Sequence, residues 1–87
     1  MNQLVVGNVV GSIVATRKNE KLVGMKLMIV EPIAKFGTTA ERFVAIDNVG
    51  AGIGETVLVA RGSAARIGCN LESAPVDAAI VGIVDEN

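Results

Sequence analysis

The chain has 87 residues, enough for one domain at the small end of the size range that folds independently, and we expect residues 1–87 to form a single domain. Eight basic and nine acidic residues give a net charge of −1, which excludes an extended electrostatic footprint for nucleic acid or an anionic membrane surface. The sequence has no histidine, which excludes Ser-His-Asp and Cys-His nucleophile systems and removes the commonest transition-metal ligand.

Five short apolar segments, rich in β-branched residues and bounded by turn residues, predict five β-strands. The first, residues 4–16, is largely apolar or small at both its odd and its even positions, so neither face is predicted to be fully solvated. Gly7 and Gly11 within it indicate sharp bending or close contact between backbones. The other strands are predicted at residues 26–33, 42–47, 55–61 and 78–84.

The connections between these strands carry turn residues and charges. Residues 17–21 are charged and predict a solvated hairpin tip. Pro32 cannot donate a ladder hydrogen bond, so the second strand is expected to end there or to lie at an edge. Residues 34–41 predict an exposed loop, and residues 62–66 predict a turn with at most one or two helical turns, for which Ser63 is the N-cap.

The distribution of apolar residues predicts an all-β protein built as a small five-stranded barrel. No segment shows ten or more residues of helical periodicity. Strands that are apolar on both faces need cover on both sides, and no helices are available to provide it. A barrel whose outer surface packs on neighbouring subunits meets this need. Composition alone, 51% hydrophobic with two phenylalanines as its aromatics, leaves a compact monomer open.

Residues 50–54, Gly-Ala-Gly-Ile-Gly, connect the third and fourth predicted strands. Three glycines in five residues permit positive φ angles and close approach of another backbone, so we predict that this loop packs against protein. A dinucleotide site is disfavoured because the glycine spacing differs and a strand follows instead of a helix. Asp47, just before the loop, is expected to accept hydrogen bonds from N–H groups of the loop.

Other candidate sites have weaker support. Cys69 is the only cysteine and has no histidine partner, so an inert thiol is favoured over a nucleophile, and a structural zinc site lacks its ligands. The carboxylates of Asp47, Glu55, Asp77 and Asp85 are expected in turns or ion pairs instead of a catalytic pair. An OB-like binding module for an oligomeric ligand is the alternative function, which the scarcity of aromatic and basic residues disfavours.

The N-terminal residues lack the basic segment and the cleavage pattern of a signal peptide. No apolar run reaches the ~18 residues that a membrane-spanning helix needs. We therefore expect a cytoplasmic protein that associates with neither membrane nor nucleic acid.

Several motifs together resemble those of the bacterial microcompartment vertex proteins, the EutN/CcmL family. The most specific are Asp-Asn-Val-Gly-Ala-Gly-Ile-Gly-Glu at residues 47–55 and Gly-Ser-Ala-Ala-Arg at residues 62–66. Further matching stretches cover nearly the whole chain in the family's order; they are residues 11–16 with Lys18, 22–27, 44–46, 57–59, 75–78 and 80–85.

The resemblance implies an OB-like five-stranded barrel that forms a homopentamer and closes the fivefold corners of a polyhedral shell. It implies no catalytic activity and no cofactor, hexameric microcompartment shell proteins as partners, and a location in a bacterial microcompartment in the cytoplasm. Arg66 offers a planar fork that suits a carboxylate or carbonyl of a neighbouring chain. The candidate subunit-interface residues carried over from the two motifs are Asp47, Asn48, Val49, Gly50, Ala51, Gly52, Gly54, Glu55, Gly62, Ser63 and Arg66.

Overall fold

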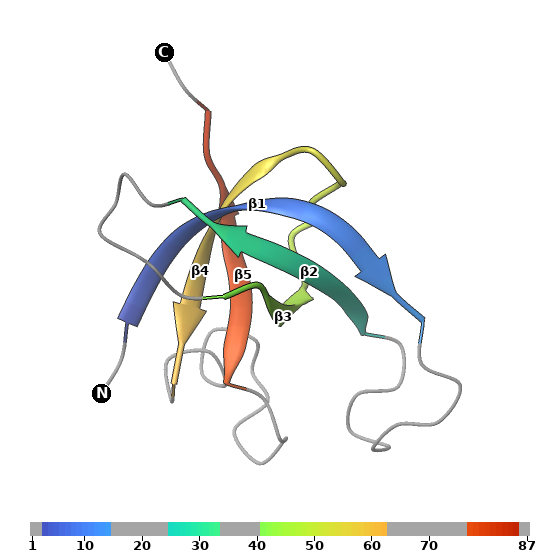
Figure 1. The fold of residues 1–87 in the computed structure, drawn as a ribbon, viewed down its shortest axis with the longest axis horizontal. Coiled ribbons are helices and arrows are strands. Elements are labelled where there is room, and N and C mark those ends of the chain that lie inside the picture. The colour runs from blue at the N-terminus through green and yellow to red at the C-terminus, as the bar shows by residue number, and fades with distance from the viewer. Residues whose placement is uncertain (1–2, 15–24, 34–40, 63–76, 86–87) are drawn as a thin grey trace.

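The computed structural model describes residues 3–14, 25–33, 41–62 and 77–85, and these ranges contain five β-strands (Figure 1). The strands are β1 (Gln3–Ile13), β2 (Lys26–Pro32), β3 (Phe43–Asp47), β4 (Thr56–Arg61) and β5 (Ala78–Ile83). All five predicted strands are confirmed, with boundaries that agree within a few residues. The predicted hairpin tip at 17–21, most of the 34–41 loop, Ser63, Arg66 and Cys69 lie outside the described residues.

The strands close into a barrel in the order β1-β2-β3-β5-β4, which confirms the predicted fold class. Neighbouring strands are antiparallel, except that β3 and β5 run parallel. The longest strand, β1, curves across the barrel and pairs with β2 along one side and with β4 along the other (Figure 1). The shared strand is therefore what closes the sheet on itself, and β2 ends at Pro32 as expected.

Close backbone contact at Gly7 explains how β1 fits between its neighbours. A Cβ atom placed there would lie 2.6 Å from Cγ1 of Val30 and 2.8 Å from the carbonyl oxygen of Glu31, so only glycine fits. Past this point the register with β2 shifts between Val9 and Gly11, which inserts Val10 as an extra residue. Such a bulge bends the strand, and barrels need bent strands to close.

Aliphatic side chains from the inward face of the strands fill the barrel. Val9, Val30, Val57, Val59 and Ile80 are each exposed by 1% or less. They come from β1, β2, β4 and β5, so the core joins strands from around the barrel. Ala51, in the connection between β3 and β4, belongs to the same cluster, which makes that connection part of the core.

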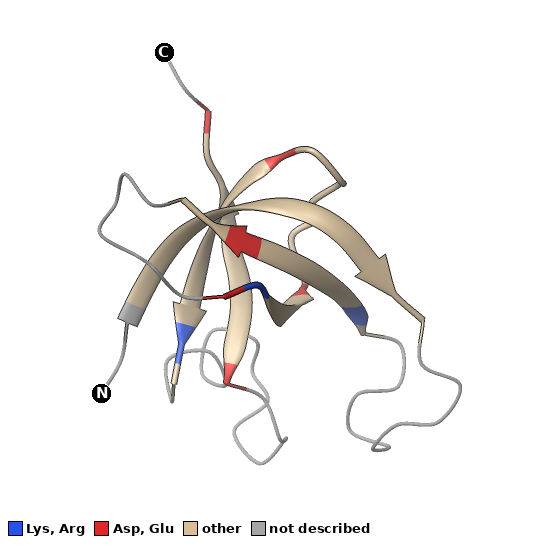
Figure 2. Cartoon of the chain, in the orientation of Figure 1, with Lys and Arg blue, Asp and Glu red and all other residues tan. Residues whose placement is uncertain are grey.

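The outward positions of the strands remain apolar in the isolated chain. Leu4 is 66% exposed, Val44 is 45% exposed and Val10 is 39% exposed. The charged residues within the five strands are Lys26, Glu31, Asp47 and Arg61, and each lies at a strand end or one residue from it (Figure 2). The described barrel therefore carries aliphatic side chains on both of its faces, as the sequence predicted.

Candidate assembly site

The connection of residues 48–55 between β3 and β4, here called the glycine loop, is organised by Asp47. Asp47 is the last residue of β3, and its side chain is completely buried. Its Oδ1 atom accepts hydrogen bonds from the backbone N–H groups of Val49, at 3.0 Å, and Gly50, at 3.1 Å. The predicted role of Asp47 is confirmed, because the carboxylate satisfies two N–H groups at the start of the loop.

Glu55 closes the second half of the loop. Its Oε1 atom accepts a hydrogen bond of 2.6 Å from the N–H of Gly52, and its own N–H donates to the Gly52 carbonyl at 3.1 Å. Gly54, inside this turn, has φ +94°, and Gly50 has φ +85°. Residues other than glycine rarely adopt these φ angles, so both positions require glycine.

The glycine loop is attached to β1 as an extension of the barrel. The N–H of Gly54 donates to the carbonyl of Val9 at 2.8 Å, and the N–H of Val9 donates to the carbonyl of Glu55 at 2.9 Å. Ala51, which belongs to the loop, is fully buried. A loop held by backbone hydrogen bonds at one end and by Asp47 at the other presents a defined surface instead of a free flap.

Lys26 lies beside the buried carboxylate. Its Nζ atom is 3.6 Å from Oδ2 of Asp47 and 3.5 Å from the carbonyl oxygen of Ala51. Within the described residues Oδ2 has no hydrogen-bond partner, and the Lys26 side chain is 59% exposed. Because Lys26 is solvated, we treat this pair as a weak electrostatic contact that holds β2 against the loop.

The outer surface of the glycine loop is apolar. Ile53 is 65% exposed and Val49 is 41% exposed. A Cβ atom added at Gly50 or at Gly54 would meet no heavy atom of the described residues within 4 Å. The loop therefore offers aliphatic side chains and open backbone to its surroundings. This surface has the character expected of a protein contact, and the contact itself stays a prediction.

The second group of candidate residues lies elsewhere. Gly62 follows β4, has φ +73°, and donates its N–H to the carbonyl of Asp77 at 2.8 Å. The glycine loop precedes β4, so the six-residue length of that strand separates the two groups. Asp77 accordingly lies with Gly62 and not with Asp47 or Glu55, and the four carboxylates do not form a single site.

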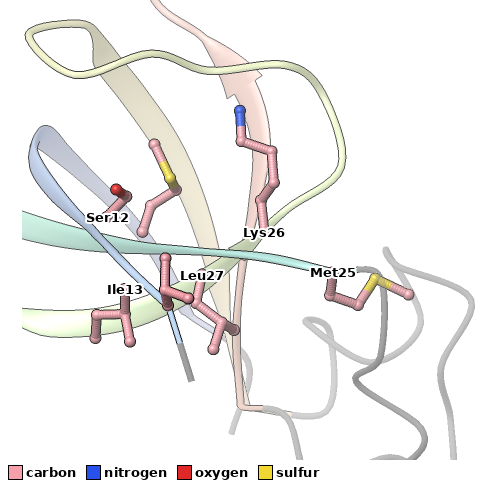
Figure 3. Close-up of a pocket in the computed structure, with 7 residues that line it drawn as sticks. Ser12, Ile13, Met25, Lys26 and Leu27 are labelled. Carbon is pink, nitrogen blue, oxygen red and sulfur yellow. The ribbon is translucent and has the colours of Figure 1, made fainter. Parts of the chain in front are cut away.

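A pocket of about 310 Å³ lies where β1 ends and β2 begins (Figure 3). Figure 3 shows Ser12 and Lys26 on one side of these strands and Ile13 and Leu27 on the other. The lining is largely apolar, and it consists of residues 12–14 and 25–28. We assign no ligand to this pocket.

Phe43 bears on the alternative of an oligonucleotide-binding barrel, since it is the one aromatic residue in the described ranges. It packs against the core cluster, and the guanidinium carbon of Arg61 lies 4.4 Å from its ring centroid. The Phe43 ring is thus engaged by the core cluster and by the Arg61 cation of its own subunit, which disfavours it as a platform for stacking a base.

The described residues were also searched for membrane-spanning helices and for clusters of metal-ligating side chains. No helix there is long and apolar enough to cross a membrane. The same ranges contain no group of three or more acidic, cysteine or histidine side chains placed to hold a metal ion.

Sequence comparison connects this chain to a family of shell proteins. The pattern of the family described as "Ethanolamine utilisation protein EutN/carboxysome" matches residues 4–85. The chain is 46% identical over 83 residues to the bacterial microcompartment shell vertex protein GrpN of Rhodospirillum rubrum, covering 91% of this chain and 90% of GrpN. It is 49% identical over 78 residues to the carboxysome shell vertex protein CcmL of Synechocystis, covering 88% and 78% of the two chains.

Structural comparison agrees with the sequence. The solved structure of the GrpN pentameric microcompartment shell protein from Rhodospirillum rubrum superposes with a TM-score of 0.80 at 43% identity. The match covers 94% of this chain and 94% of that one. An ethanolamine utilization protein, EutN, gives a TM-score of 0.86 at 44% identity over 95% of this chain and 88% of its own.

Proposed function

This chain belongs to the EutN/CcmL family of microcompartment shell vertex proteins, and on that premise we propose that it closes the fivefold vertices of a bacterial microcompartment as a homopentamer. It is a structural protein and not an enzyme, like the family to which it belongs. The observation that carries the proposal is the near-complete structural match to a relative described as pentameric.

The function of a vertex protein depends on the number of subunits in its ring. Flat sheets of hexagonal tiles cannot curve into a closed polyhedron unless fivefold units replace hexagons at the corners. A ring of five identical subunits supplies such a unit by its symmetry alone. No chemical step is required of any side chain, which agrees with the aliphatic character of the exposed barrel surface.

The glycine loop is our proposed site of contact between subunits, with Gly62 and its turn as the second. Val49 and Ile53 supply apolar area, and the open backbone at Gly50 and Gly54 permits a neighbouring chain to approach closely. Asp47 and Glu55 act indirectly, because they fix the loop from within the subunit. For Ser63 and Arg66 the proposal rests on the family motif only.

The partners in the assembled shell would be hexameric facet proteins, and the location would be a microcompartment in the cytoplasm. Both follow from the vertex role, since a pentamer closes only a shell whose facets are built by other subunits. The vertex role requires no nucleic acid or membrane partner.

The test is assembly of shells with and without this chain. Facet proteins from the same organism should form closed polyhedra in electron micrographs when the chain is co-expressed, and open sheets or tubes when it is left out. Closed particles of unchanged shape in its absence would contradict the vertex role. A variant that folds and cannot form pentamers serves as the control for nonspecific effects of expression.

A further inference from the structure

We draw no further inference here: the strongest candidate, the buried Oδ2 atom of Asp47 between β2 and the glycine loop, lies against the Lys26 ammonium group and belongs to the site already described.

Discussion

The Nζ atom of Lys26 lies 3.6 Å from Oδ2 of Asp47, a carboxylate whose side chain is entirely buried while that of Lys26 is 59% exposed. The other oxygen of Asp47, Oδ1, accepts hydrogen bonds from two backbone N–H groups of the glycine loop. One side chain thus links β2, the end of β3 and the loop, and the loop conformation depends more on its Oδ1 atom than on Lys26.

Asp47→Ala should lower the free energy of unfolding by about 3 kcal/mol, because two N–H groups lose a charged acceptor in a buried position. Asp47→Asn keeps an acceptor oxygen and should cost about 1 kcal/mol. Lys26→Met, the control for the ion pair, should also cost no more than about 1 kcal/mol because that cation is solvated. Urea unfolding of the three variants measures these differences, and an Asp47→Ala protein as stable as the parent would refute the role given to Oδ1.

Glu55→Ala should lower stability by about 1–2 kcal/mol and increase hydrogen exchange at the Gly52 amide, which donates to the Glu55 carboxylate at 2.6 Å. Glu55→Gln retains an acceptor oxygen and should change stability by less than about 1 kcal/mol. Hydrogen exchange followed by NMR reads the Gly52 amide directly. Unaltered protection in Glu55→Ala would mean that the loop is held without this bond.

Gly7→Ala should destabilise the barrel by about 2–3 kcal/mol, because its Cβ would lie 2.6 Å from Val30 Cγ1 and 2.8 Å from a backbone oxygen. Gly82→Ala is the matched control, since its nearest contact would be Leu58 Cβ at 3.9 Å, an ordinary distance. Thermal unfolding of the two variants makes the comparison. Similar losses in both would show that strand propensity, and not close packing at β1, sets the cost.

Gly52→Val should weaken the ring more than it weakens the subunit. A Cβ at this position lies 3.4 Å from Glu55 Oε1, a contact that a small shift relieves, whereas a neighbouring chain packed on the loop would meet the whole side chain. We expect dissociation on dilution at a concentration roughly tenfold higher than for the parent. Mass photometry across a dilution series measures this, and an unchanged ring would place the loop outside the interface.

The sequence was sufficient for the five strands and the barrel, because β-branched runs between turn residues mark strands independently of their partners. It could not tell which face points inward. Leu4 and Val5 are equally apolar, yet closure buries Val5 and leaves Leu4 66% exposed. Where both faces of a strand are apolar, side-chain alternation carries no signal, and only the pairing register decides.

The same limit applies to the candidate site. The hydrogen bonds that Asp47 accepts from the loop were predictable, since an aspartate before a glycine turn commonly accepts hydrogen bonds from nearby backbone N–H groups. The bond between Glu55 and Gly52 and the parallel pairing of β3 with β5 were not predicted, because each depends on how the barrel closes. The separation of Gly62 from the glycine loop likewise follows from the extended length of β4.

Native mass spectrometry of the purified chain measures the central claim most directly. We predict a principal species of five times the 9.0 kDa chain mass at micromolar concentration, with no dimer in excess. A stable monomer at that concentration would contradict the pentamer, because the aliphatic outer surface of the barrel would then need no second copy.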